Sequence, residues 1–275
     1  MSNDPLRIDT EVVELVLRRF LHDEITKAGF SRGVIGLSGG IDSALSCFLA
    51  AAALGPENIL ALRMPYKDSS QDSLDHAQLV VDELGVTCET INITSIVSPL
   101  FSKSPGMDAN RRGNIMARTR MTILYDRSAA WQGLVIGSSN KSELLLGYGT
   151  LFGDLASAVN PLGDLYKTQV RQLATAIGVP PVIIEKEPSA DLIPGQTDEG
   201  DLGFSYADVD QILYLLVDRR FSPEEVEAAG YEAEFIQNVL KMVNSSHFKR
   251  RPPVIAKVSE RTIGHDFRYL RDSGL

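Results

Sequence analysis

The feature that most constrains the fold is a bare polar turn, Ser38-Gly39-Gly40-Ile41-Asp42-Ser43, set between an apolar run and an alanine-rich segment. The run at residues 34–37 is bounded by Gly33 and predicts a buried strand. Residues 42–54 predict a helix, because Gly55-Pro56 is a typical helix stop. A strand that passes directly into a helix through glycines is the start of a βαβ unit.

The rest of the first half repeats this alternation of strands and helices. Strands are predicted at residues 59–64, 87–93 and 134–136, and helices at 8–28, 74–84 and 110–130. This order predicts an α/β protein with an open parallel sheet and helices on both faces. In such sheets ligands bind beyond the carboxyl ends of the strands, where the turns at 38–43 and 137–143 fall.

The last third of the chain has a different character. Residues 163–178 contain a predicted helix, and residues 185–206 are rich in Pro, Gly, Asp and Glu without periodicity. A loop of that length is usually functional or mobile, so we expect residues 185–206 to form a mobile loop at the active site. Two C-terminal helices are predicted to follow, the second opening with a capping box at Ser222-Pro223-Glu224-Glu225. We expect residues 1–275 to form a single domain.

Composition excludes several classes of protein. The net charge of -9 disfavours a protein that binds the nucleic-acid backbone, although Arg111, Arg112, Arg118 and Arg120 form one local basic cluster. No apolar run reaches the length of a membrane span, and no signal peptide is visible. The charge and the lack of an apolar span lead us to expect no nucleic-acid or membrane partner. The two cysteines form no CxxC pair, so we expect a reducing cytoplasm.

The polar turn has the chemistry of a phosphate site. A helix N-terminus presents unpaired N–H groups, and Gly39 and Gly40 let the backbone approach an anion. Asp42 is repulsive beside phosphates unless it holds a Mg²⁺ that bridges to them. The alternative is a tight turn in which Asp42 caps the helix. The whole string favours nucleotide binding, and it resembles the SGGxDS signature of the PP-loop ATP pyrophosphatases, which cleave ATP between the α and β phosphates.

A second carboxylate follows the strand at 134–136. Glu143 stands where it could reach the same metal ion as Asp42, because both turns lie at strand carboxyl ends. The alternative is that Glu143 is an early-turn acid that stabilises its own helix. Spacing alone does not distinguish the two interpretations.

Several further motifs resemble the NAD synthetase family and occur in that family's order over residues 30–255. They are GSSNKSE (137–143), DLYKTQV (164–170), KEPSADL (186–192), GQTDE (195–199) and FKRRPP (248–253). The resemblance implies an adenine-nucleotide alpha-hydrolase-like fold and a ligase that amidates deamido-NAD to NAD. The carboxylate would be adenylated by ATP with release of pyrophosphate, and ammonia would then displace AMP. It also implies Mg²⁺ as cofactor and a homodimer with the dinucleotide site at its interface.

The resemblance assigns roles to particular residues. Asp42 and Lys167 would be catalytic, and Asp42 and Glu143 would hold Mg²⁺. ATP would be bound by Gly36, Leu37, Ser38, Gly39, Gly40, Ile41, Asp42, Ser43, Ser138, Lys167 and Ser189. The dinucleotide would be bound by Arg118, Asp154, Phe248 and Lys249. The alternatives are a solvated lysine at Lys167, an exposed helix arginine at Arg118 and a solvated charged segment at Lys249.

The chain departs from the family pattern around the nicotinate end of the dinucleotide. Leu151 stands in place of a lysine and Ala158 in place of an aspartate, while Asp154 is retained. Phe248-Lys249 stands where the family has His-Lys, with His247 one place upstream. We therefore expect the contacts at that end of the substrate to differ from those of other members.

The sequence also bears on the nitrogen donor and on the competing functions. Glutamine-dependent members carry an added amidase domain that does not fit in 275 residues, so we expect free ammonia, or ammonia from a separate subunit. The competing interpretations are a tRNA-modifying or GMP-forming PP-loop enzyme and an inactive nucleotide-binding regulator. Release of pyrophosphate that requires a second substrate would distinguish them.

Overall fold

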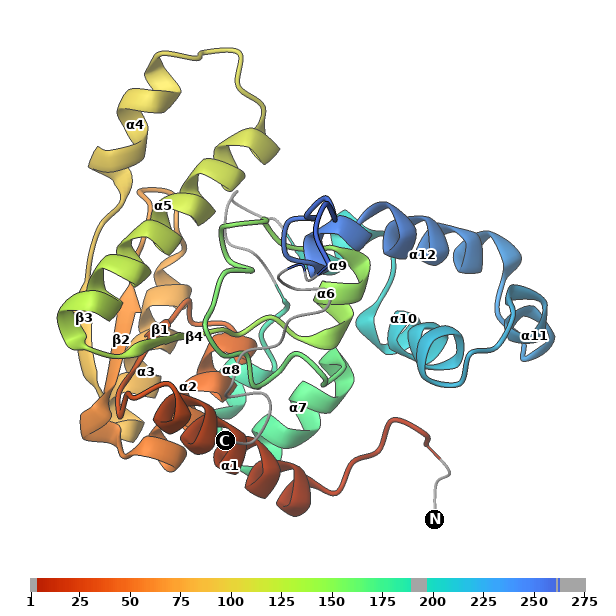
Figure 1. Cartoon of the computed structure of the whole chain (residues 1–275), viewed down its shortest axis with the longest axis horizontal. Coiled ribbons are helices and arrows are strands. Elements are labelled where there is room, and N and C mark those ends of the chain that lie inside the picture. The colour runs from red at the N-terminus through yellow and green to blue at the C-terminus, as the bar shows by residue number, and fades with distance from the viewer. Residues whose placement is uncertain (1–3, 189–196, 261, 263–275) are drawn as a thin grey trace.

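The computed structural model describes residues 4–188, 197–260 and 262. Its centre is a four-stranded sheet with the order β3-β2-β1-β4, in which every neighbouring pair is parallel (Figure 1). The strands are β1 (Gly33–Gly36), β2 (Ile59–Arg63), β3 (Thr87–Thr90) and β4 (Leu134–Ile136). The predicted open parallel sheet is confirmed. β1 pairs with both β2 and β4, so its carboxyl end opens at the middle of the sheet.

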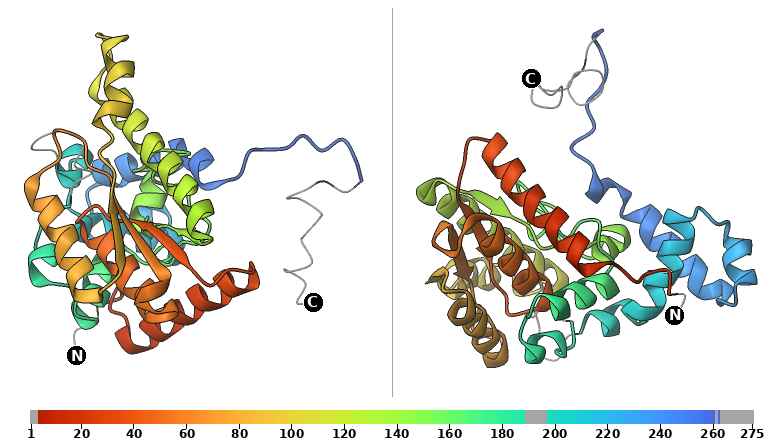
Figure 2. Two further views of the ribbon diagram at one scale, coloured as in Figure 1. Left: turned by 90° about the vertical axis from the view of Figure 1, so that its left-hand side faces the viewer. Right: turned by 90° about the horizontal axis from the view of Figure 1, so that it is seen from below.

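Helices cover both faces of the sheet, as predicted (Figure 2). One face, which carries Ile35, packs against α1 (Thr10–Lys27), α2 (Ile41–Leu54), α3 (Gln71–Leu84) and α7 (Lys167–Ala176). The other face, which carries Val34, packs against α4 (Thr94–Ser102) and α5 (Ala109–Trp131). Successive strand side chains point to opposite faces, so a strand buried on both sides must be apolar throughout.

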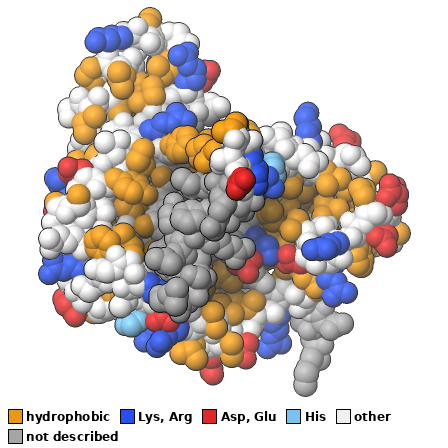
Figure 3. Space-filling view, in the orientation of Figure 1, with side chains coloured by type: hydrophobic (Ala, Val, Ile, Leu, Met, Phe, Trp, Pro, Cys, Tyr) orange, Lys and Arg blue, Asp and Glu red, His pale blue; other side chains and the backbone are white. Residues whose placement is uncertain are grey.

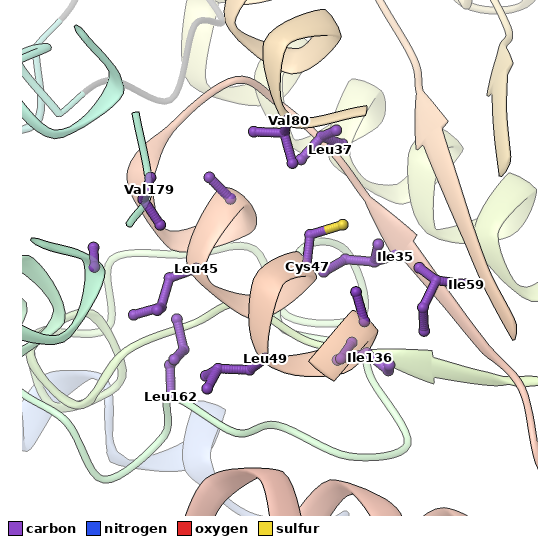
Figure 4. Close-up of a cluster of buried hydrophobic side chains, with 14 of the residues drawn as sticks. Ile35, Leu37, Leu45, Cys47, Leu49, Ile59, Val80, Ile136, Leu162 and Val179 are labelled. Atoms are coloured by element: carbon purple, nitrogen blue, oxygen red, sulfur yellow. The ribbon is translucent and has the colours of Figure 1, made fainter. Parts of the chain in front are cut away.

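The central helix α2 is buried along most of its length, and its alanines suit that crowded position. Leu45, Cys47 and Leu49 point from α2 into a cluster that includes Ile35 and Ile136 of the sheet (Figure 4). Small residues along the same helix let it lie close to the strands. Replacing one of these buried leucines by alanine would cost about 2–5 kcal/mol of stability. This packing fixes the position of the helix end that carries the polar turn.

The C-terminal helices form a second core. They are α10 (Tyr206–Leu213), its π-helical continuation Tyr214–Asp218, α11 (Pro223–Ala228) and α12 (Ala233–Ser245), followed by the 3-10 turn His247–Arg250. Their buried side chains pack with Leu146 of α6 (Lys141–Leu146), and hydrophobic side chains gather over them in Figure 3. The capping box at Ser222 is confirmed. The prediction of two helices is wrong, because Gly230 with φ +104° separates α11 from α12.

The helices α4 (Thr94–Ser102) and α9 were not expected from the sequence. α4 contains Pro99, which is typical of a helix break, yet Val97 and Phe101 are buried against the sheet and outweigh that propensity. α9 (Asp198–Leu202) lies inside the predicted loop 185–206, where the Thr197 side chain caps it. The remaining short elements are the 3-10 turn Pro56–Asn58 and α8 (Pro181–Ile184).

Across the described part of the chain, no helix combines the length and the apolar character that crossing a membrane requires.

Candidate active site

The polar turn after β1 is preformed by its own hydrogen bonds. The Leu37 amide donates to the Leu62 carbonyl at 2.9 Å, which continues the sheet into the turn. The Ser43 hydroxyl accepts from the Ser38 amide at 3.2 Å and lies 3.0 Å from the Ser38 hydroxyl. The N-cap residue of α2 is Gly40, which has no side chain to cap the helix. The N-terminus of α2 is therefore capped by no side chain and faces a pocket.

Gly39 is required at its position. Its φ is +81°, and a Cβ there would lie 2.1 Å from the backbone oxygen of Ser73. Any other residue would be strained and would also push α3 away from the turn. The turn and α3 are thus in direct backbone contact.

Three charged side chains from three different elements meet beside this turn. The Lys167 ammonium donates to Asp42 Oδ2 and lies 3.4 Å from Glu143 Oε1. The Asn140 side chain donates to Asp42 Oδ1 at 2.9 Å. The Lys167 side chain is 2% exposed, so the alternative of a solvated lysine is wrong. Asp42 does not cap its helix, and that alternative is wrong as well.

The interpretation of Glu143 as an acid that stabilises its own helix is confirmed. Its Oε2 accepts the Asn140 amide at 3.3 Å, and the Asn140 side chain accepts the Glu143 amide at 3.0 Å, which completes a capping box on α6. Its Oε1 faces Lys167. The cap thus orients the carboxylate that the sequence placed near Asp42.

The electrostatics of this cluster follow from burial. Burial raises the pKa of the Glu143 carboxyl to about 8, and the Asp42 carboxylate adds to that effect, while Lys167 opposes it. Burial also disfavours the Lys167 ammonium, but Asp42 and Glu143 outweigh it, so the pKa of Lys167 lies above its ordinary value. Two carboxylates share one ammonium, so a further cation beside them would favour the ionised form of Glu143.

A buried network holds Lys167 from behind. Its amide donates to the Ser142 hydroxyl at 2.9 Å, and the Thr168 amide donates to Asp210 Oδ2 at 2.9 Å. Ser142 in turn donates to Asp210, which has no exposed surface. The Lys167 ammonium also lies 5.2 Å from the centre of the Tyr206 ring. Helices α6, α7 and α10 are therefore joined directly behind the charged cluster.

The cluster opens into a pocket of about 720 Å³ beyond the carboxyl ends of the strands. Most of the predicted residues line it: Gly36, Leu37, Ser38, Gly40, Ile41, Asp42, Ser43, Ser138, Glu143, Asp154, Lys167 and Lys249. Gly39 belongs to the same turn and lies against the backbone of Ser73. Arg118 and Phe248 are exposed and are not among the described residues that line the pocket. Ser189 lies outside the described residues, as do residues 189–196 of the predicted loop.

Three of the four predicted dinucleotide residues contact one segment of backbone. Lys249 Nζ donates to the carbonyls of Gly147 at 2.7 Å and Gly149 at 2.8 Å. Asp154 accepts the Thr150 amide at 3.0 Å, and Arg118 Nε donates to the Leu151 carbonyl at 3.3 Å. Lys249 is therefore not a solvated charge. It braces the wall of the pocket that contains Leu151.

Several residues of the site had not been predicted. Asn140 could have been found, because Asn-Lys-Ser-Glu at 140–143 is a capping-box pattern. Tyr148 donates to Asp198 Oδ1 at 3.0 Å, and Asp198 is buried beside Tyr206. Nothing local in the sequence marks Asp198 or Asp210 as partners of residues that precede them by dozens of positions.

The candidate metal ligands are the two carboxylates of the cluster. Within residues 4–188, 197–260 and 262, no group of three or more His, Cys, Asp or Glu side chains is arranged to hold a metal ion. Asp42 and Glu143 converge on one cation, Lys167, and offer hard oxygen donors. Such a pair suits a divalent cation that takes its other ligands from phosphate oxygens and water.

Comparison with known proteins agrees with this geometry. A family model described as NAD synthase matches residues 13–253. The NH(3)-dependent NAD(+) synthetase of Trichlorobacter lovleyi is 57% identical over 269 residues, which cover 98% of each chain. The solved structure of the NH3-dependent NAD synthetase from Campylobacter jejuni, in complex with the nitrate ion, has a TM-score of 0.79. It is 34% identical and covers 91% of this chain and 100% of that one. The structure of NMN synthetase from Francisella tularensis has a TM-score of 0.80 at 30% identity, covering 91% and 99%.

Proposed function

The chain belongs to the NAD synthase family, and from that premise we propose how its residues carry out the reaction. The enzyme is a ligase that uses ATP and ammonia to convert the carboxylate of deamido-NAD to the amide of NAD. The observation that carries the assignment of roles is that the buried Lys167 lies between Asp42 and Glu143, beside the polar turn.

In the first step a carboxylate oxygen of deamido-NAD attacks the α-phosphorus of ATP. The bond from that phosphorus to the bridging oxygen breaks, and pyrophosphate leaves with the electron pair. The turn from Ser38 to Ser43 binds the phosphates through its amides and hydroxyls. Lys167 stabilises the negative charge that builds on the phosphate oxygens, which is an effect of preorganised electrostatics.

In the second step ammonia attacks the acyl carbon of the adenylate. The carbon–oxygen bond breaks, AMP leaves with the former carboxylate oxygen, and the nitrogen gives up its surplus proton to solvent. A free carboxylate is a poor acceptor for ammonia, whereas AMP is a good leaving group. The protein contributes mainly by positioning the two reactants and by excluding water.

Asp42 and Glu143 are proposed to hold Mg²⁺. Their oxygens already converge on a cation. Burial, with a contribution from the Asp42 carboxylate, raises the pKa of Glu143, and a divalent ion would favour the ionised carboxylate. When bound there, Mg²⁺ would neutralise charge on the phosphates. Ser138 and Ser189 are proposed to contact ATP.

The dinucleotide is proposed to bind along the wall made by residues 147–154. Asp154 and Lys249 line the pocket there. Arg118 and Phe248 lie exposed outside it, which suits a homodimer whose interface completes the dinucleotide site. The fold is proposed to act as one domain over residues 1–275, with residues 185–206 bordering ATP.

A second candidate substrate is suggested by Leu151 and Ala158. The family pattern has a lysine and an aspartate at these positions, so this chain offers fewer charged groups to a dinucleotide. One relative in structure is named an NMN synthetase. A related mononucleotide carboxylate, nicotinate mononucleotide, is therefore the competing substrate.

The test is an assay of pyrophosphate release with ATP, Mg²⁺ and ammonium, supplied with deamido-NAD or with nicotinate mononucleotide. Mass spectrometry identifies the nucleotide product. We expect NAD to form only in the complete mixture and deamido-NAD to be the better substrate. Preference for the mononucleotide would overturn the dinucleotide assignment, and pyrophosphate release without either substrate would overturn the ligase mechanism.

A further inference from the structure

The charged cluster leaves the phosphates of ATP short of positive groups. Lys167 carries one positive charge but faces two carboxylates, Asp42 and Glu143, so these three groups together offer no surplus cation. A triphosphate binding over the adjacent turn needs further compensation, most of all at the two phosphates that leave together as pyrophosphate.

Lys186 is placed to supply that charge. It lines the same pocket as the turn, and its ammonium donates to the Ser73 hydroxyl at 2.8 Å. Among the ion pairs of the described residues, none joins Lys186 to a carboxylate. Its partner in the described structure is thus a neutral hydroxyl, and a phosphate oxygen would be a stronger one.

Ser73 locates this lysine beside the turn. The Ser73 backbone oxygen lies 2.1 Å from the position that a Cβ on Gly39 would take, so this part of α3 touches the turn directly. The Ser73 hydroxyl also accepts from Ser70 at 2.8 Å and is 5% exposed as a residue. The hydroxyl that holds Lys186 is therefore fixed within the wall of the phosphate pocket.

The backbone of Lys186 is fixed on both sides. Arg171 donates to the Ile184 carbonyl at 3.1 Å, and Ile183 is fully buried in the core. Beyond it, the Asp198 amide donates to the Pro188 carbonyl at 2.8 Å. A side chain that starts from an anchored backbone and ends on a fixed hydroxyl loses little freedom when it binds an anion.

We propose that Lys186, held by Ser73, binds the β- and γ-phosphates of ATP opposite the Ser38–Ser43 turn, and that it remains on the pyrophosphate after cleavage. This inference rests on the proposed function for the site, but it gives Lys186 a role that the resemblance did not assign to this first residue of the KEPSADL motif. Lys167 then acts at the phosphorus that is attacked, and Lys186 acts on the group that leaves.

The test compares the binding of two products by the full chain in the presence of Mg²⁺. Pyrophosphate contains the phosphates that Lys186 would bind, whereas AMP does not. Lys186→Met is expected to weaken pyrophosphate binding about tenfold to hundredfold, as for a lost charged hydrogen bond, and to leave AMP binding unchanged. Lys186→Arg is expected to restore most of the affinity, and Ser73→Ala to cause a smaller loss than Lys186→Met.

Lys241→Met on the exposed side of α12 is the matched control. The inference is overturned if Lys186→Met binds pyrophosphate as tightly as Lys241→Met. It is also overturned if AMP affinity falls as much as pyrophosphate affinity, or if the wild type binds no pyrophosphate. Neither measurement uses the dinucleotide. A protein that binds pyrophosphate through Lys186 but amidates no substrate would keep this inference and overturn the proposed function.

Discussion

At the scale of single residues, the site is defined by a buried lysine that is paired with two carboxylates. A buried ammonium is costly unless it is paired, and Lys167 is paired with Asp42 and Glu143. The arrangement keeps Lys167 charged, as its raised pKa indicates, and holds it rigidly beside the turn. Such a charge requires no reorganisation when negative charge develops on a phosphate.

Replacing Asp42 by asparagine is expected to abolish pyrophosphate release. The variant keeps the size of the side chain but removes the charge that pairs with Lys167 and that is proposed to hold Mg²⁺. The measurement is the rate of pyrophosphate release at saturating substrates, with the exposed Asp82→Asn as control. Full activity in Asp42→Asn would contradict the role given to this carboxylate.

Replacing Lys167 by methionine is expected to lower kcat/KM by the equivalent of about 2–4 kcal/mol, the scale of one lost charge-stabilising group. Methionine keeps much of the buried stem, so packing should suffer little. Steady-state kinetics with varied ATP measure the loss, and circular dichroism checks the fold. A wild-type rate would mean that Lys167 is only a structural counter-ion.

At the scale of elements, the turn from β1 into α2 is the unit that is proposed to bind the phosphates. Its geometry depends on Gly39, which combines a positive φ with the contact to Ser73. Gly178 after α7 has a similar φ of +86°, but a Cβ added there would meet nothing within 4 Å. Substitutions at the two glycines therefore distinguish the cost of backbone strain from the cost of losing the contact with Ser73.

Gly178→Ala is expected to lower the free energy of unfolding by about 1 kcal/mol, from backbone strain alone. Gly39→Ala should lose more than that and should also raise the KM for ATP, because α3 and the turn must move apart. Urea denaturation and initial rates measure both effects. Equal stability losses with an unchanged KM in both variants would contradict the contact between turn and α3.

The buried thiol of Cys47 on α2 is expected to make the free energy of unfolding depend on alkaline pH. Burial raises the pKa of this thiol from its ordinary value of 9.0 to about 12. The folded protein keeps the thiol proton over a range in which the unfolded chain loses it. This contribution to stability is therefore complete below pH 9 and is lost as the pH rises towards 12.

The free energy of unfolding of the wild type should accordingly fall more steeply with alkaline pH than that of Cys47→Ala. By about pH 11 the accumulated difference should amount to about 2–3 kcal/mol. Urea denaturation of both proteins between about pH 8 and about pH 11, at intervals of about one unit, measures it. Parallel curves would mean that Cys47 ionises in the folded protein and is not enclosed by the core.

At the scale of the whole molecule, the site lies where two cores meet. Val170 and Leu173 of α7 belong to the core on the sheet face that carries Ile35. Tyr166, just before α7, and Leu146 of α6 belong to the C-terminal core. Lys167 and Glu143 start from these same two helices. The relative position of the two cores therefore sets the geometry of the charged cluster.

Much of this arrangement could be predicted from local patterns. The strands at 34–37, 59–64 and 134–136 are apolar runs with clear stops, and the glycines and hydroxyls of the turn at 38–43 favour nucleotide binding over a simple capped turn. The parts that were missed depend on long-range packing. α4 forms despite Pro99 because Phe101 is buried, and Asp210 becomes a partner of Thr168 only when α10 folds back onto α7.

The central claim is that the substrate carboxylate becomes joined to AMP before ammonia arrives. Deamido-NAD with ¹⁸O in both carboxylate oxygens tests it directly, with mass spectrometry of AMP, pyrophosphate and NAD after turnover. The mechanism predicts that AMP carries one ¹⁸O, that the NAD amide keeps the other, and that pyrophosphate carries none. Label in pyrophosphate, or AMP without label, would contradict the adenylated intermediate and with it the roles given to the residues of the site.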